Sequence, residues 1–167
     1  MHTIYTIGYG SLAIEDFLGL LKKSGIRILV DIRSKPYSKA RPEYRKKELD
    51  RAVRQEGLEY SFLGDKLGGM PEDDTFYDSE GNVDYALLQD SPVYNQGIME
   101  LIASAEKSDI CIMCAEALPE RCHRGFLISE TLYTSGIETK HILHDGKIVD
   151  HGKLRVKFDS GQIDLFR

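Results

Sequence analysis

Residues 3–32 have the sequence TIYTIGYGSLAIEDFLGLLKKSGIRILVDI, which contains a complete strand–helix–strand pattern. Residues 3–8 are rich in apolar and β-branched side chains and run into glycines, which is typical of a short strand. Apolar side chains then recur at helical spacing after a candidate N-cap, Ser11, and Gly25 ends this predicted helix. Residues 26–32 are almost entirely apolar, as expected of a parallel strand covered on both faces.

The same alternation continues along the chain. Further strands are predicted at 58–63, 109–114 and 139–143, and further helices at 42–56, 93–107 and 121–135. We therefore predict a single α/β domain over residues 1–167, with a three-layer, mostly parallel open sheet of about five strands and helices on both faces.

Three connecting segments carry their own signals. Asp145-Gly146 is a turn pair and predicts a small C-terminal hairpin. The glycines of residues 64–69 indicate a flexible loop, and the acidic stretch 71–91 has no clear period and predicts a long surface excursion.

Composition favours a globular intracellular protein. Of 167 residues, 41% are hydrophobic and 29% are charged, which is typical of a domain with its own core. The apolar runs have the length of strands, and the first ten residues lack the pattern of a signal peptide. Three cysteines do not indicate a secreted disulfide framework, so we expect a cytoplasmic location.

The net charge of −5 conceals a strong asymmetry. Basic residues crowd the segment 33–54, whereas residues 67–106 contain no lysine or arginine. One interpretation is a solvated helix face with i,i+4 pairs Glu43–Lys47 and Asp50–Arg54. The other is a non-catalytic nucleic-acid-binding module that uses the basic helix 41–54. Its phosphate contacts would be Arg41, Arg45, Lys46 and Arg51.

Polar and reactive side chains follow the predicted strands. In open parallel sheets, ligands bind beyond the carboxyl ends of the strands, so these segments are expected to converge. They are Gly8–Ser11, Asp31–Arg33, Gly64–Asp65, Cys114–Glu116 and His141–His144.

The segment from Cys114 to Arg124 carries the densest chemistry. It holds two thiols, two carboxylates, an imidazole and two guanidinium groups within eleven residues, where a helix is predicted to start. A helix N-terminus and nearby arginines favour anions and lower thiol pKa values. We predict a catalytic site in which Cys114 or Cys122 is the thiolate, His123 the acid/base and Glu116 a second acid/base or orienting group. Arg33 and Arg124 would hold the anion.

A metal site is the second interpretation of these residues. Cys114, Cys122 and His123 are suitable ligands, with His141 or His144 as a fourth. The spacing matches no zinc pattern, and adjacent Cys-His is awkward for one tetrahedral ion, so a metal is possible but not favoured. Cys111 and Cys114 are three apart on a strand, point to opposite faces and do not form a redox pair.

The turn after the first strand allows a third function. Gly8 and Gly10 fit G-x-G-x-x-A before a helix, and Asp31 ends the next strand, which is the arrangement of a dinucleotide fingerprint. A smaller version is a backbone cradle for an anion at Gly8, Gly10 and Ser11. Asp31 and Arg33 are two apart and are expected to point the same way, as a pair beside this turn.

Together these segments resemble the bacterial and archaeal domain-of-unknown-function family 488. The matching pieces are Thr6–Gly10, Asp31–Pro36, Leu67–Gly69, Cys114–Glu116 with Cys122–Arg124, and His141–Leu143 before Asp145-Gly146. The resemblance implies an α/β fold and a shared Cys/Glu/Cys/His/Arg signature, and it implies no particular reaction. We therefore expect an enzyme that acts on a phosphate-bearing substrate, a nucleotide or nucleic acid, at this signature.

Overall fold

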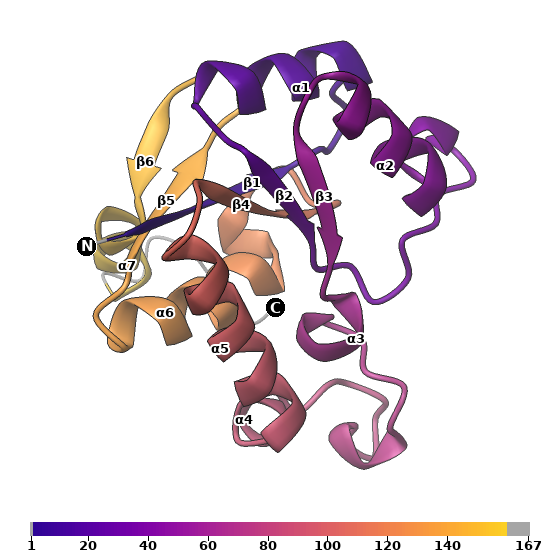
Figure 1. The fold of residues 1–167 in the computed structure, drawn as a ribbon. Helices are drawn as coiled ribbons and strands as arrows, with labels where there is room; N and C mark the ends of the chain where they lie inside the picture. Colours follow the sequence, from indigo (N-terminus) through magenta and orange to yellow (C-terminus); the bar gives the residue numbers. More distant parts are fainter. Residues whose placement is uncertain (1, 160–167) are drawn as a thin grey trace.

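The computed structural model of the protein describes residues 2–159. Its centre is one six-stranded sheet with the strand order β3-β2-β4-β1-β5-β6 (Figure 1). The strands are β1 (Thr3–Gly8), β2 (Ile28–Asp31), β3 (Glu59–Phe62), β4 (Ile110–Cys114), β5 (Glu138–Ile142) and β6 (Ile148–Asp150). The first five are parallel, and β6 returns antiparallel to β5. The predicted mostly parallel sheet with a C-terminal hairpin is confirmed.

Helices cover both faces of the sheet, as Figure 1 shows. They are α1 (Ile14–Lys23), α2 (Lys46–Gln55), α3 (Gly64–Leu67), α4 (Tyr85–Gln89), α5 (Pro92–Ala105), α6 (Glu130–Thr134) and α7 (His151–Asp159). Helices α1 and α2 lie on one face, and α5 and α6 lie on the other. This is the predicted three-layer arrangement.

Two apolar cores result, one on each face of the sheet. Strand β4 shows the division most clearly, because Ile110, Ile112 and Cys114 belong to the core beneath α5. Cys111 and Met113 belong to the core beneath α1 and α2. The alternation follows from the two-residue period of a strand. It places Cys111 and Cys114 on opposite faces, as predicted.

Several predicted boundaries were wrong because local turns interrupt the helices. The first helix starts at Ile14 after Ala13, and Ser11 is not its N-cap. The basic helix is divided into a 3-10 turn, Pro42–Tyr44, and α2, because Arg45 between them is extended. The predicted flexible loop after β3 contains the short helix α3.

Two further segments also differ from the prediction. The acidic excursion contains the 3-10 turn Asp74–Phe76 and α4. The predicted helix 121–135 is a π-helical turn, Arg124–Ser129, continued by α6. Helix α7 follows the hairpin and was not predicted. Its apolar residues do not recur at helical spacing, so the sequence carries little sign of an amphipathic helix there.

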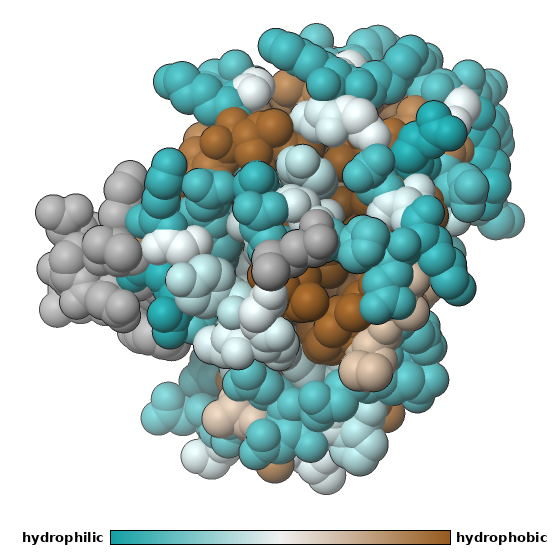
Figure 2. Space-filling model, turned by 60° about the vertical axis from the view of Figure 1, so that its left-hand side comes forward, coloured by the Kyte–Doolittle hydropathy of each residue, from teal (hydrophilic) through white to brown (hydrophobic). Residues whose placement is uncertain are grey.

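The outer surface is largely polar on the face drawn in Figure 2, where hydrophobic residues are exposed in separate areas among hydrophilic ones. Within residues 2–159, no helix combines the length and the apolar character that crossing a bilayer requires.

Candidate functional site

Strands β2, β4 and β1 are neighbours in the sheet, so their carboxyl ends lie together. A pocket of about 350 Å³, called here the site pocket, opens at this edge. Its lining residues are Tyr9, Arg33, Ser34, Lys35, Tyr37, Gly69, Met70, Tyr85, Cys114, Ala115, Glu116, Arg121, Cys122, His123 and Phe126. The structure thus brings together Arg33 and four predicted catalytic residues, Cys114, Glu116, Cys122 and His123.

Cys114, Cys122 and His123 form a compact group that we call the Cys/His cluster. Cys114 ends β4, and the other two stand just before the π-helical turn. His123 Nδ1 lies 3.9 Å from Cys114 Sγ and 3.8 Å from Cys122 Sγ. All three residues are buried, yet all three line the site pocket. Two thiols and one imidazole therefore lie next to one another in the wall of the site pocket.

The orientation of the His123 ring is set from outside the cluster. Its Nε2 lies 3.0 Å from the carbonyl oxygen of Leu67. A carbonyl only accepts, so Nε2 carries the proton and donates. In the neutral ring, Nδ1 then presents its lone pair to the two sulfurs.

The two thiols of the cluster do not titrate alike. A hydrogen bond from the Cys114 thiol lowers the pKa of Cys122, and Arg124 and the charged form of His123, which carries a proton on both ring nitrogens, lower it further against the effect of burial. The same hydrogen bond, together with burial, raises the pKa of Cys114. The sequence left open which cysteine is the more reactive, and these surroundings favour Cys122 as the thiolate.

Glycines bring the backbone of residues 64–69 against the site. A Cβ on Gly69 would stand 2.8 Å from His123 Cγ, and one on Gly64 would stand 1.9 Å from the Arg33 carbonyl oxygen. A Cβ on Gly68 would stand 2.1 Å from Ser34 Oγ. The predicted flexible loop is therefore a closely packed segment, and its glycines permit the contact that orients His123.

Arg124 has a structural position, contrary to the predicted role as an anion clamp. It is 1% exposed, and its guanidinium donates to the carbonyl oxygens of Glu116 at 2.6 Å and Ala117 at 3.0 Å. Its Nε donates to Thr6 Oγ1 at 3.3 Å. The side chain holds the loop after β4 against β1, so its donors are not available to a substrate.

The glycine turn after β1 receives that same loop. A Cβ on Gly8 would stand 1.6 Å from the carbonyl oxygen of Glu116. The backbone N–H of Gly10 donates to the Ala115 carbonyl, and the N–H of Tyr9 donates to the Cys114 carbonyl. The predicted anion cradle is therefore wrong at Gly8 and Gly10, because the protein's own backbone fills the turn there, whereas Ser11 is exposed.

Asp31 and Arg33 do point the same way, and they form a buried bidentate pair. Arg33 Nε and Nη2 donate to the Asp31 carboxylate at 2.9 and 2.7 Å. Burial alone would lower the pKa of Arg33, but hydrogen bonding and charge attraction from Asp31 raise it. Asp31 also accepts from Tyr60 at 2.6 Å and is fully buried. Its carboxylate is therefore unavailable to a ribose, and the predicted dinucleotide fingerprint is wrong at this residue.

The predicted fourth metal ligands lie elsewhere. His144 Nε2 donates to the Gly8 carbonyl at 2.7 Å. His141 belongs to a buried chain in which Thr6 Oγ1 lies 2.7 Å from its Nδ1, and its Nε2 lies 3.0 Å from His151 Nδ1. His151 Nε2 in turn lies 3.1 Å from a Glu130 carboxylate oxygen. Burial lowers the pKa of His141 to about 3, so both of its ring contacts are made by a neutral ring.

The basic segment uses much of its charge internally. Arg41 donates to the carbonyl oxygens of Gly10 and Leu12 and pairs with Glu43, in place of the predicted Glu43–Lys47 pair. The Glu43 partner changes because Pro42–Tyr44 is a separate turn. The predicted Asp50–Arg54 pair is present at 2.5 Å.

The family model for the domain of unknown function DUF488 matches residues 13–130, which is more than half of the chain. The chain belongs to the DUF488 family. The match includes Arg33 and the whole loop from Cys114 to Arg124, so the site lies inside the family domain. No curated protein matches the chain.

Among solved structures, two crystal structures of a DUF442 protein from Shewanella putrefaciens CN-32, named as a candidate phosphatase, are similar. Both are 16% identical, with TM-scores of 0.41 and 0.37. The similarity covers 78% and 75% of this chain, and 64% and 66% of the other. This DUF488 chain thus spans under two thirds of the first structure. Structural similarity this low says nothing about the activity of the DUF488 chain.

Several residues of the DUF488 site were not found from the sequence. The Leu67 carbonyl that orients His123 is a backbone atom and gives no residue-type signal. Tyr85 and Phe126 pack edge to face at 5.0 Å in the wall of the pocket, but Tyr85 begins α4 and Phe126 lies in the π-helical turn, far apart in the chain. Lys35 belongs to the quoted Asp31–Pro36 motif, and its position beside Arg33 could have been noticed there.

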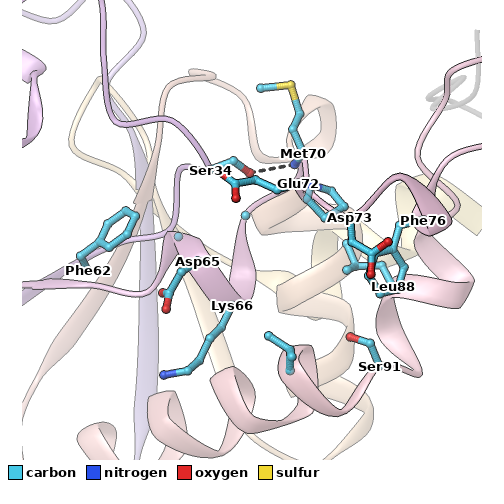
Figure 3. A pocket seen from close by; sticks show the side chains of 14 residues that line it. Ser34, Phe62, Asp65, Lys66, Met70, Glu72, Asp73, Phe76, Leu88 and Ser91 are labelled. Carbon is cyan, nitrogen blue, oxygen red and sulfur yellow. Dashed lines mark hydrogen bonds between the residues drawn. The ribbon is translucent and has the colours of Figure 1, made fainter.

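A second pocket, of about 390 Å³, shares Ser34 and Met70 with the site pocket. Figure 3 shows these two residues joined by the hydrogen bond from the Met70 N–H to Ser34 Oγ. Three carboxylates line the second pocket: Asp65, Glu72 and Asp73. Lys66 in the same lining is paired with Glu100 at 2.9 Å. The negative charge of the second pocket therefore disfavours an anionic ligand, whereas the positive charge of the site pocket favours one.

Proposed function

We propose that this DUF488 protein is an enzyme that binds a phosphate-bearing substrate, such as a nucleotide, in the site pocket and acts on it with the Cys/His cluster and Glu116. The observation that carries the proposal is the state of Arg33. This side chain lines the pocket, is 5% exposed, and has one guanidinium nitrogen, Nη1, that is buried without a hydrogen-bond partner.

An unpaired buried donor is unfavourable in a folded protein. Leaving such a group without an acceptor costs about 1–3 kcal/mol, and more for a charged group. Within the described residues, Arg33 Nη1 is the one buried side-chain nitrogen or oxygen in this state. Asp31 already holds the other two nitrogens in a fixed fork. Nη1 is covered in this structure, so a phosphate oxygen in the pocket would supply the missing acceptor after a movement of the side chains that cover it, among them Tyr9, whose ring centre lies 5.5 Å from the guanidinium.

The charge of the lining supports the same class of ligand. Lys35 and Arg121 are exposed side chains of the pocket and join Arg33, whereas Glu116 is the one carboxylate among the lining residues. Three cations around a concave surface favour an anion. The aromatic faces of Tyr85 and Phe126 lie in the same lining and would suit the base of a nucleotide.

The reactive groups lie where such a substrate would be held. The thiolate form of cysteine, and not the thiol, acts as a nucleophile or a metal ligand. A thiolate at Cys122 could take either role in the site pocket. Glu116 is exposed to the pocket and can donate or accept a proton in the reaction. The three free, buried thiols also suit a reducing compartment, and we propose the cytoplasm.

Nucleic-acid binding by the basic segment is less well supported. Arg41 donates to backbone carbonyls, and Arg45 donates to the Ser38 carbonyl at 2.9 Å. Two of the four predicted phosphate contacts are therefore engaged within the protein. No observation favours this function over the pocket.

Binding of inorganic phosphate tests the proposal. We expect wild-type protein to bind inorganic phosphate in isothermal titration, and Arg33→Lys to weaken it at least tenfold. Lysine keeps the positive charge beside Asp31. It lacks the planar guanidinium in which two nitrogens bind Asp31 while the third, Nη1, has no partner. Arg54→Lys is the matched control, because Arg54 is a half-exposed partner of Asp50 and is absent from the pocket lining. Equal phosphate affinity in the wild type and Arg33→Lys, with both folded, would contradict the proposal.

A further inference from the structure

The Cys/His cluster has the composition and spacing of a metal site. Cys114 Sγ, Cys122 Sγ and one nitrogen of His123 all lie within 4.8 Å of one another. The two sulfur-to-Nδ1 distances are 3.9 and 3.8 Å. With zinc–sulfur and zinc–nitrogen bonds of about 2.3 and 2.0 Å, a sulfur and a nitrogen at a tetrahedral angle are about 3.5 Å apart. Both sulfur-to-nitrogen distances therefore lie within about half an ångström of those in a zinc site, and the two sulfurs lie within 4.8 Å of each other.

The local backbone explains how adjacent residues reach the same point. Cys122 is extended, with φ −132° and ψ 141°, whereas His123 is helical, with φ −56° and ψ −24°. The change of conformation between them turns both side chains toward Cys114. The objection raised from the sequence, that neighbouring Cys and His are awkward ligands, does not apply to this geometry.

The second ring nitrogen of His123 has the partner that metal-bound histidines usually have. Its Nε2 donates to the Leu67 carbonyl, which leaves Nδ1 as the ligand atom and fixes the plane of the ring. The absence of a side chain at Gly69 makes room for the ring in this position. The histidine is thus held in the tautomer and orientation that a metal requires.

Charge and burial are consistent with a divalent ion. Two thiolates and a divalent cation sum to zero charge, which suits residues that are 8%, 3% and 8% exposed. Thiolate and imidazole ligands select zinc over magnesium or calcium. The cluster provides three ligands and lines an open pocket, whereas closed structural sites use four.

We propose that Cys114, Cys122 and His123 bind one zinc ion, with the fourth coordination position open to the site pocket. The inference concerns the same site as the proposed function and names its cofactor. In such sites the fourth position takes water or a substrate oxygen. Arg33, Lys35 and Arg121 would then hold the anionic part of the substrate beside the ion.

Metal titration of the full chain tests this inference without any activity assay. Reduced, chelator-treated protein is titrated with Zn²⁺ against a chromophoric chelator. We expect one ion per chain with a dissociation constant below about 1 μM, and release of protons as the ligands bind. Co²⁺ is then used as a spectroscopic probe, because thiolate ligands give it a charge-transfer absorption in the near ultraviolet.

Variants assign the ligands. Cys114→Ser and Cys122→Ser are each expected to remove about half of the cobalt charge-transfer absorption, because each removes one of two thiolates. His123→Gln is expected to weaken zinc binding at least tenfold and to leave that absorption in place. Cys111→Ser is the matched control, since Cys111 is fully buried on the other face of the sheet and should change nothing.

The outcomes separate this inference from the proposed function. Failure of the wild type to bind zinc below about 1 μM overturns the metal site, as does binding that survives loss of Cys114 and Cys122. Neither result affects phosphate binding by Arg33. Zinc binding with no affinity for inorganic phosphate would support the metal site and contradict the proposed substrate class.

Discussion

Acidification should destabilise the fold through the buried histidine behind the site. His141 is fully buried, and burial together with the neighbouring His151 lowers its pKa from 6.5 to about 3. The unfolded chain therefore binds a proton that the folded chain excludes. Stability is complete above pH 6.5 and falls as the pH drops toward 3. A pH of 5 lies 1.5 units below the unfolded pKa of 6.5. At about 1.36 kcal/mol per unit, His141 alone then lowers the free energy of unfolding by about 2 kcal/mol.

Urea unfolding at pH 7.5 and pH 5.0 measures this loss. Carboxylates also titrate in this range, so the comparison is between the wild type and His141→Gln, which keeps polar atoms but cannot be protonated. We expect the wild type to lose about 2 kcal/mol more than the variant between the two pH values. His2→Gln is the control, because His2 is exposed and its loss should leave the pH dependence unchanged. A wild type and His141→Gln with the same pH dependence would refute the reasoning.

Four further substitutions have expected outcomes. Gly8→Ala should lower the melting temperature by several degrees, because the added Cβ would overlap the Glu116 carbonyl oxygen. Gly19→Ala places its Cβ in open space on α1 and should raise the free energy of unfolding by about 0.5–1 kcal/mol. Arg124→Lys should cost about 2–3 kcal/mol in urea unfolding, since one ammonium cannot reach both carbonyls and Thr6; an unchanged midpoint would show that these bonds contribute nothing. Glu116→Gln should leave the melting temperature unchanged and slow turnover by about 10²–10⁴-fold, and equal rates in the variant and wild type would remove Glu116 from the chemistry.

The fold was predictable where local pattern and burial agree. The apolar runs of β1, β2 and β4 and the helical spacing in α1 and α5 are strong signals, because each element packs a continuous face into one of the two cores. Helix ends and turns were less predictable. The division of the basic helix at Arg45 and the π-helical turn at Arg124–Ser129 depend on contacts with distant segments, which residue types alone do not reveal.

The convergence of these residues at the candidate site was also predictable, but the contacts that each of them makes were not. The rule that ligands bind at the carboxyl ends of parallel strands brought Arg33, Glu116 and the Cys/His cluster together. It did not distinguish groups that face the pocket from groups that support it. Gly8 and Arg124 carry the right residue types for anion binding, and tertiary packing uses both to hold the loop after β4.

Turnover of phosphate esters tests the central claim most directly. Wild-type protein, Cys122→Ser and Cys111→Ser are incubated with a panel of nucleotides and simple phosphate mono- and diesters, and product formation is followed by mass spectrometry. We predict that the wild type and Cys111→Ser consume at least one member of the panel at similar rates and that Cys122→Ser does not. Equal turnover by Cys122→Ser, or no consumption of any phosphate ester by the wild type, would contradict the assignment of the Cys/His cluster as the catalytic centre.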